Sequence, residues 1–416
     1  MIDILYIGGI VSDQHIDADC IDTIDAKTAV NDILEWSFVK GLEENLGQPI
    51  SIINAFTIPT FPKDSLWIKG KTWQHCDSSV NHRASFLNIF AIRNFSRKQS
   101  LSKLAIQWAK LNPQHNKAIV VYTTHSPFLC AAVAAKRTNS NIRICNIIPD
   151  LPAYTKHAYS WRRPLYSFFR FFDLWVIARQ FEKIDCYAFF SEHMKEKIDV
   201  SSKKFRVVEG VANPSLVEIK QNVPSPVSSQ KTVFYAGGIS KRNGIELLLD
   251  SINYIEDPDI HFILCGQCND DKLIKKMEAK RGRLQYKGLL SKKEVCKLQQ
   301  EATVLINPRT ADGDFTRYSF PSKTLDYLAS GKPVICFALE GIPGEYDTFL
   351  HYIPENTPQA IAQTIQRICN LSEEERFEMG MRGLMFVEKC KNNVAQMKKI
   401  TDMLKEYFIN NMGERM

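Results

Sequence analysis

The sequence predicts an α/β protein of two Rossmann-like domains, and three observations lead to this expectation. Short apolar segments alternate with segments of helical periodicity along the chain. The chain has 416 residues, 44% of them hydrophobic, which suits two cores rather than one. A proline- and serine-rich stretch, residues 219–231, separates two sets of alternating segments. We therefore expect domains at residues 1–218 and 232–388, joined by that linker and followed by a helix at residues 389–416.

The first domain is expected to begin with a buried strand at residues 1–9. This apolar stretch lacks the basic start and the small-residue cleavage site of a signal peptide. Further strands are expected at residues 117–122, 141–148 and 185–190. Because helical segments separate them, the strands are expected to be parallel and covered by helices.

The second domain is expected to repeat this alternation. Its strands are predicted at residues 232–238, 261–265, 302–307 and 334–337. Its helices are predicted at residues 245–252, around 294–300, and over most of 358–408. A nicotinamide-binding domain is the obvious competitor, but residues 6–10 lack the Gly-x-Gly-x-x-Gly spacing that brings a pyrophosphate to a helix start.

Residues 314–336 form the most informative segment, because a loop, a helix and a buried strand follow one another there. Pro321 stands where a first helical residue is tolerated, so the helix is expected to begin near it, and Gly331 is expected to end the helix. The unpaired N–H groups and positive dipole end of a helix N-terminus favour a phosphate, and Lys323 adds charge. The expected diphosphate seat consists of Ser319, Phe320, Pro321, Ser322 and Lys323.

This segment resembles the donor-site signature of the retaining glycosyltransferase family 4, whose members have the GT-B fold. That signature has two acidic residues separated by seven others, followed by a helix and Gly-Lys-Pro-Val. Here Asp326 occupies the second acidic position, Tyr318 occupies the first, and residues 331–334 match in full. The resemblance implies that Asp326 accepts hydrogen bonds from the nucleotide ribose and that position 318 faces the sugar and diphosphate. An ordinary helix-surface charge is the alternative for Asp326.

The resemblance also implies the overall reaction. It indicates two domains facing a cleft, with residues after about Lys389 crossing back to the first domain. The donor would be a nucleoside diphosphate sugar, with UDP-sugars favoured, and the acceptor a glycan or a polyprenyl-diphosphate-linked molecule, as in bacterial polysaccharide assembly. No cofactor and no metal are expected. Asp312 and Asp314 have metal-motif spacing, but in an unsuitable fold context.

A second phosphate element is expected where the second domain begins. Gly237 and Gly238 follow a strand and would let a ligand approach the backbone closely. Arg242 is the favoured phosphate contact and Lys241 the alternative, whereas Asn243 stands where a lysine is common in the family. Solvated loop charges are the competing interpretation for both cations.

Further cleft residues are expected at the carboxyl ends of strands, where open α/β sheets bind ligands. Gly266 and Arg309 follow two such strands, and Lys287 lies in a turn that resembles the family's nucleotide-base contact. Asp312 and Asp314 precede the main motif and either replace the acid missing at position 318 or are simply solvated.

The first domain offers weaker candidates. His125 follows a strand and is expected either to hydrogen-bond the sugar or acceptor, or to be structural. Asp150 is expected to contact the acceptor or to cap a turn. Gly8 and Gly9 begin the first loop, near the sugar by the resemblance, and residues 209–213 resemble a structural segment that closes the domain.

Composition and charge limit the remaining partners. Residues 159–175 mix aromatic and basic side chains, which suits either a peripheral membrane helix or a buried helix with an arginine-lined edge. The net charge of +7 comes with no nucleic-acid-binding module. The eleven cysteines are scattered, which suits a reduced cytoplasmic protein, and a metal at Cys265 and Cys268 is not expected. The inner face of the plasma membrane is one location to test.

The predicted activity is therefore a metal-independent hexosyl transfer. The departing nucleoside diphosphate gains negative charge as an oxocarbenium-like sugar forms, so fixed dipoles and cations favour the transition state. Arg242, Lys323 and His125 are the candidate catalytic residues. A GT-B sugar-nucleotide epimerase and a non-catalytic nucleotide-sugar-binding scaffold are the alternatives.

Overall fold

A computed structural model describes residues 2–11, 26–90, 92–152, 164–212 and 230–413 of the chain. Two compact units account for them. The first comprises Met1–Val211 together with Asn393–Met416, and the second comprises Ala212–Asn392. Most of the expected linker lies outside the described residues.

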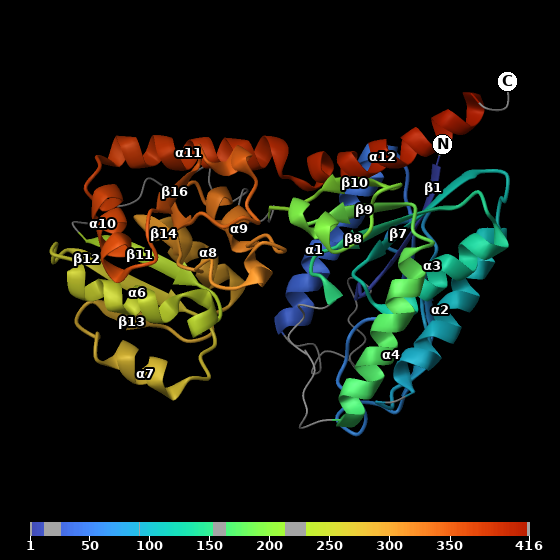
Figure 1. The fold of residues 1–416 in the computed structure, drawn as a ribbon, viewed down its shortest axis with the longest axis horizontal. Helices are drawn as coiled ribbons and strands as arrows, with labels where there is room; N and C mark the ends of the chain where they lie inside the picture. Colours follow the sequence, from blue (N-terminus) through green and yellow to red (C-terminus); the bar gives the residue numbers. More distant parts are fainter. Residues whose placement is uncertain (1, 12–25, 91, 153–163, 213–229, 414–416) are drawn as a thin grey trace. The chain divides into compact units, whose positions relative to one another are not determined.

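The first unit is built on an eight-stranded sheet with the order β10-β9-β8-β7-β1-β2-β5-β4 (Figure 1). All pairings in it are parallel except that of β4 with β5. The strands are β1 (Ile2–Gly8), β2 (Ser51–Asn54), β4 (Lys71–Trp73), β5 (Asn81–Arg83), β7 (Asn116–Tyr122), β8 (Arg143–Ile148), β9 (Cys186–Phe189) and β10 (Lys204–Val207). A separate antiparallel pair joins β3 (Trp67–Ile68) to β6 (Phe86–Leu87).

The α-helices among the described residues of this unit are α1 (Ala26–Leu46), α2 (Arg93–Lys110), α3 (Ser126–Thr138), α4 (Pro164–Phe181) and α12 (Asn393–Gly413). A short 3-10 helix, η3, spans Glu192–Glu196. The central strands are almost wholly buried, as expected for a parallel sheet with helices on both faces.

The last helix of the chain, α12, is part of the first unit, as the sequence predicted. The Asn45 side chain of α1 donates to the Val394 carbonyl at 2.8 Å, and Gln396 donates to the buried Glu209 carboxylate at 2.8 Å. Glu406 forms ion pairs with Lys204 at 2.7 Å and with a neighbouring arginine of β10 at 2.9 Å. The buried Glu209 therefore has the structural role expected for its segment.

The second unit is a six-stranded, fully parallel sheet with the order β13-β12-β11-β14-β15-β16. In chain order this is 3-2-1-4-5-6, the doubly wound Rossmann arrangement. The strands are β11 (Lys231–Ala236), β12 (Ile260–Cys265), β13 (Leu284–Tyr286), β14 (Val304–Asn307), β15 (Val334–Phe337) and β16 (Leu350–Ile353). The two Rossmann-like domains predicted from the sequence are thus confirmed.

Helices α6 (Ile245–Ser251), α7 (Asp271–Glu278), α8 (Lys292–Glu301) and α9 (Lys323–Ala329) connect successive strands from β11 to β15. Helices α10 (Pro358–Cys369) and α11 (Glu373–Cys390) follow β16. Short 3-10 turns are η5 (Lys241–Asn243), η6 (Ile252–Tyr254), η7 (Asp314–Thr316) and η8 (Gly344–Tyr346). Capping boxes start α8 at Ser291 and α11 at Ser372, because each serine bonds reciprocally with a glutamate three residues later.

Candidate functional site

Three glycines end neighbouring strands of the second sheet and bring their backbones together. A Cβ atom on Gly266 would lie 1.8 Å from the Gly237 carbonyl oxygen, so β11 and β12 end in direct contact. The Gly266 N–H donates to the Gly288 carbonyl at 2.7 Å, which joins the turn after β13 to the same edge. All three have positive φ values, a region that favours glycine.

Lys323 occupies the space that the missing Gly237 side chain leaves open. A Cβ atom on Gly237 would lie 1.7 Å from the Lys323 Nζ. That ammonium donates to the Tyr235 hydroxyl at 3.1 Å and lies 4.8 Å from the centre of the Tyr235 ring. The Tyr235 hydroxyl in turn donates to the Gly238 carbonyl at 3.1 Å. Gly237 and Lys323, 86 positions apart in sequence, thus form one structure at the end of β11.

The Lys323 ammonium has an unusually low proton affinity. Burial, aided by the positive charge of Arg309 and opposed by the Asp326 carboxylate, lowers its pKa to about 8. At pH 7 the ammonium form still predominates. An anionic group placed beside Lys323 would relieve this cost, because opposite charge favours the protonated form.

Two arginines approach the aromatic ring of Phe315, which lies in the loop before α9. The guanidinium of Arg242 lies 3.9 Å from the centre of the Phe315 ring, and that of Arg309 lies 4.7 Å from it. Arg309 also donates to the Ser319 hydroxyl at 2.8 Å, and Ser319 donates to the Phe315 carbonyl at 2.9 Å. Phe315 therefore places both guanidinium groups next to the predicted diphosphate seat.

Gly244 allows the loop after β11 to contact the end of β14. It has a φ of +74°, and a Cβ atom there would lie 1.7 Å from the Pro308 carbonyl oxygen. Asn243, just before it, donates to the Gly238 carbonyl at 2.6 Å. The close contact between these two loops explains how Arg242 and Arg309 come to share a ring.

The predicted seat itself is only partly accessible to a ligand. Tyr318, Phe320 and Pro321 are buried, and the Phe320 ring packs 5.3 Å from that of Tyr346. Ser322 is exposed, and its side chain makes no capping bond. Side-chain contact through Phe320 is therefore ruled out by its packing in the core.

The helix start differs from the expected one. Helix α9 begins at Lys323, two residues after Pro321, and has seven residues. The Thr324 N–H donates to the Pro321 carbonyl at 2.8 Å, and the Leu325 N–H donates to the Ser322 carbonyl at 3.2 Å. These two N–H groups are therefore used within the turn, and Lys323 at the start of the helix supplies a positive charge.

The remaining predicted donor-site residues divide into two groups. Asp326 is half-buried on α9, one turn after Lys323, and Lys287 is half-buried beside the end of β12. Lys241, by contrast, is exposed and pairs with Glu246 at 2.8 Å, so the geometry favours Arg242 over Lys241. Asp312 is also exposed and accepts from Asn356 at 3.1 Å, and the Asp314 side chain lies outside the described residues.

The carboxyl edge of the first sheet contains a buried carboxyl group. Glu35 is 3% exposed, and it accepts hydrogen bonds from the Gly9 N–H at 2.8 Å and from the Tyr6 hydroxyl at 3.2 Å. Burial raises the pKa of Glu35 to about 8, although these hydrogen bonds act against the shift. At pH 7 the Glu35 carboxyl group is thus largely protonated, and it holds the loop after β1 through Gly9.

His125 lies at the end of β7, two positions after Thr123, which has the unusual φ of +68°. Burial, together with the nearby charges of Arg97, Arg93 and Arg170, lowers the pKa of His125 to about 3. The imidazole is therefore neutral at physiological pH. Asp150 follows β8 at the same edge and is exposed.

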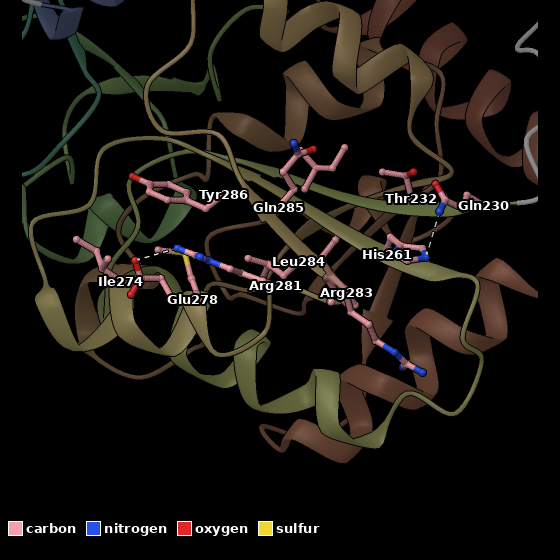
Figure 2. A pocket seen from close by; sticks show the side chains of 14 residues that line it. Gln230, Thr232, His261, Ile274, Glu278, Arg281, Arg283, Leu284, Gln285 and Tyr286 are labelled. Atoms are coloured by element: carbon pink, nitrogen blue, oxygen red, sulfur yellow. Dashed lines mark hydrogen bonds and ion pairs between the residues drawn. The ribbon is translucent and has the colours of Figure 1, made fainter.

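The second unit also has a surface pocket near β13 and α7. Figure 2 shows a pocket of about 580 Å³ lined by residues near β13 and α7, including His261 and Arg281. Gln230 donates toward His261 at 3.4 Å, and Arg281 pairs with Glu278 at 3.4 Å. Gln230, Thr232 and His261 lie where β11 and β12 begin, at the end opposite to Gly237. Neither Lys323 nor Gly237 lines this pocket, although Tyr286, another of its lining residues, donates to the Gly266 carbonyl at 2.7 Å.

Sequence reasoning missed Tyr235, Phe315 and Glu35. Tyr235 and Phe315 look like ordinary core residues in the sequence, and only the fold places them beside Lys323 and the two arginines. Glu35 could have been suspected, because it is an acidic residue in an otherwise apolar stretch of its helix.

Comparison with known proteins agrees with this architecture. Residues 230–370 match the family model described as glycosyl transferases group 1. A glycosyltransferase from Rickettsia africae superposes with a TM-score of 0.63 at 12% identity, covering 98% of this chain and 99% of that one. The chain has the GT-B glycosyltransferase fold.

Two further structures have the same fold. Sucrose-phosphate synthase from Thermosynechococcus elongatus has a TM-score of 0.60 at 15% identity, covering 98% of this chain and 100% of that one. Anabaena HepE, solved with UDP and glucose, has a TM-score of 0.55 at 12% identity, covering 97% and 100%. No curated protein matches the sequence.

Two features of the described residues concern membrane spanning and metal ligation. Among these residues, no helix combines the length and apolar character needed to span a membrane. Nor do three or more histidine, cysteine or acidic side chains come together there as metal ligands. The predicted aromatic and basic run at residues 159–175 is described from Pro164 onward, within α4.

Proposed function

We propose that the protein is a retaining glycosyltransferase that moves a hexose from a nucleoside diphosphate sugar to an acceptor hydroxyl. The observation that carries this proposal is the placement of Lys323 against Gly237 at the carboxyl end of β11. β11 and β14 are neighbours at the point where the strand order reverses. Doubly wound sheets bind their ligands at this switch point.

The charges at this edge suit a diphosphate leaving group. Lys323, Arg309 and Arg242 supply three positive charges near one loop. As the bond between sugar and diphosphate breaks, negative charge grows on the diphosphate oxygens. Cations already held in place lower the energy of this transition state without needing to reorganise. The low pKa of Lys323 adds to the effect, because a neighbouring anion relieves an existing cost.

The donor and acceptor are assigned by analogy and chemistry. Asp326 would bind the ribose, Lys287 and Gly288 would face the base, and Tyr318 stands where the family has an acid toward the sugar. The match to group 1 glycosyl transferases and the likeness to a fold neighbour solved with UDP and glucose support a UDP-sugar donor. A glycan or a polyprenyl-diphosphate-linked molecule is the proposed acceptor class, and no metal is required.

The test is a binding and hydrolysis screen of the purified protein against UDP-, GDP- and ADP-sugars, with and without a chelator. We expect one nucleotide to raise the melting temperature and to release sugar slowly in both conditions. Asp326→Asn should weaken binding, because it removes the charged acceptor for the ribose hydroxyls. Lys297→Ala, an exposed lysine on α8 with a side chain 75% accessible, is the matched control.

The outcomes separate the competing functions. Sugar epimerised in the absence of acceptor would indicate an epimerase instead. Binding without hydrolysis or transfer to any acceptor would indicate a scaffold. If no nucleotide sugar binds, the donor-site proposal is wrong.

A further inference from the structure

The first unit has an open groove between α2 and α4, with Ser126 and Pro127 at the start of α3 also in its lining. It encloses about 600 Å³, which is within the range of small-ligand pockets. Its wall combines residues at the start of α2 with one face of α4, and these two helices lie along α3 (Figure 1). The lining includes Phe90, Arg93, Lys98, Phe169, Phe172 and Trp175.

Large aromatic side chains in and around this groove are exposed to an unusual degree. On α4, the exposed fractions of the side chains are 66% for Phe168, 61% for Phe171, 57% for Phe172 and 45% for Trp175. Near the start of α2, they are 50% for Phe90 and 58% for Phe95. The Phe172 and Trp175 rings stack with centroids 5.6 Å apart. A contiguous apolar surface of this kind marks a site of interaction rather than ordinary exposure.

The same groove has a positive rim. Arg93, Lys98, Arg170 and Arg179 line it, whereas Asp173 is the only carboxylate among the lining residues. Asp173 is already occupied, because it accepts from the Ser126 hydroxyl and from Arg170 at 3.3 Å. The rim therefore has an excess of positive charge that no described acidic lining residue offsets.

Arg93 is one of the lining residues and is held by a backbone contact. Its Nη1 donates to the Ile58 carbonyl at 3.0 Å, while its buried Nε has no hydrogen-bond partner among the described residues. Burial lowers the pKa of this guanidinium. A buried donor without a partner is costly, so an oxyanion that reached Arg93 would be stabilised.

We propose that this groove binds one apolar chain of a lipid whose head carries a phosphate or diphosphate. The aromatic wall would remove the chain from water, and Arg93 and Lys98 would pair with the phosphate oxygens. A concave groove of this volume favours one chain over a flat bilayer surface. Binding of such a lipid does not depend on the proposed transferase activity, whereas its use as the sugar acceptor does.

The test uses farnesyl diphosphate below its critical micelle concentration as a monomeric probe, measured by titration calorimetry without any nucleotide sugar. Farnesol and inorganic pyrophosphate are the two half-probes. Because both the chain and the charge contribute, we expect farnesyl diphosphate to bind at least about tenfold more tightly than either.

Two variants and two matched controls locate the site. Phe172→Asp and Lys98→Glu should each weaken farnesyl diphosphate binding by about tenfold or more, through lost apolar contact and reversed charge. Phe377→Asp on α11, at a phenylalanine that is 63% exposed, and Lys297→Glu on α8 repeat these changes elsewhere and should leave binding unchanged. Lys323→Ala should also leave it unchanged, which separates this groove from the donor site.

Three results would overturn the proposal. Pyrophosphate alone could bind as tightly as farnesyl diphosphate. Vesicles of anionic phospholipid could bind through Phe172 and Lys98 while the monomeric probe does not, which would make this face a bilayer surface. Sedimentation could show that Phe172→Asp dissociates a dimer while the probe again fails to bind, which would assign the face to a second copy of the chain.

Discussion

The carboxyl edges of the two sheets carry opposite kinds of chemistry. In the second unit this edge gathers Lys323, Arg309 and Arg242, all positively charged at pH 7. In the first unit the same edge holds Glu35 and His125, whose pKa values of about 8 and about 3 leave both largely neutral. Similar sheets thus present one edge with a cluster of cations and another whose buried acid and histidine are both largely uncharged.

The difference in charge between the two edges comes from the groups that pack against the loops at each edge. In the second unit, glycine at position 237 lets an ammonium group approach the backbone. In the first unit, Glu35 is buried beneath the loop, and three nearby arginines oppose a charge on His125. Burial therefore sets the chemistry of each edge as strongly as residue type does.

The largest expected effect comes from removing the ammonium group of the second edge. Lys323→Ala should lower kcat/KM for sugar transfer by about 10²- to 10³-fold, which is typical for one transition-state hydrogen-bond donor. Steady-state kinetics would measure it, with Lys297→Ala as the control. A loss below about threefold would show that Lys323 does not stabilise the leaving group.

Gly237→Ala tests whether the missing side chain at position 237 is what allows the Lys323 ammonium group to lie there. The new methyl group would displace the ammonium, so donor affinity should fall by about 10- to 100-fold, as for other lost charge-assisted contacts. Gly282→Ala is the control, since a Cβ atom there meets nothing within 4 Å. In a Lys323→Ala background, Gly237→Ala should add little to the loss of affinity measured by calorimetry. Full additivity would contradict the proposed pairing.

The pH dependence of donor binding should follow Lys323. With a pKa of about 8, the ammonium form declines above that pH, so donor affinity should fall by about tenfold between pH 7 and 9 if only that form binds. Lys323→Met should flatten this profile. Because folding depresses this pKa below its unfolded value of 10.5, the same group makes stability rise between pH 8 and 10.5. A profile unchanged by the substitution would assign the titration to another group.

Glu35 should give the first unit the opposite pH dependence. The folded pKa of Glu35, about 8, exceeds the unfolded value of 4.5. The contribution of Glu35 to the free energy of unfolding is therefore complete below pH 4.5 and is lost as the pH rises toward 8. Glu35→Gln, which keeps an acceptor for Gly9, should remove at least about 1.4 kcal/mol of this change, the equivalent of one pKa unit. Hydrogen exchange of the β1 amides, corrected for intrinsic rates, measures this change in stability with pH. Identical pH slopes in both proteins would refute a buried, protonated Glu35.

The smallest expected effect is at His125. A histidine that is neutral above about pH 4 cannot produce a titration between pH 5 and 8. His125→Asn should therefore leave the shape of the pH–rate profile unchanged and reduce the rate by less than the ~100-fold typical of a lost general base. Disappearance of a limb of that profile would restore His125 as a proton-transfer residue.

Prediction from the sequence succeeded where periodicity and turn chemistry were strong. The strand at Val334–Phe337 was placed to the residue, and β7, β12 and α8 were placed within one or two positions of their bounds. The helix before Val334 was expected to begin near Pro321, yet α9 begins at Lys323 because a turn uses the first N–H groups. Local bonding of this kind does not appear as a pattern in the sequence.

The division into units also needed the structure. The sequence placed the final helix from residue 389, whereas α11 continues to Cys390 and the first unit resumes at Asn393. Residues 358–408 were expected to be mostly helical, and the different packing partners of α11 and α12, which are α9 and α1, separate the two helices.

The sequence by itself determined the two alternating sets of strands and helices, the Gly-Lys-Pro-Val strand start and the presence of Lys323 and Asp326 in one helix. These depend on local periodicity and on residues that are close along the chain. Only the tertiary structure decided that Lys323 meets Gly237, that Phe315 lies against two arginines, and that Glu35 is protonated. These features depend on contacts between distant segments and on burial, which residue order does not encode in any local pattern.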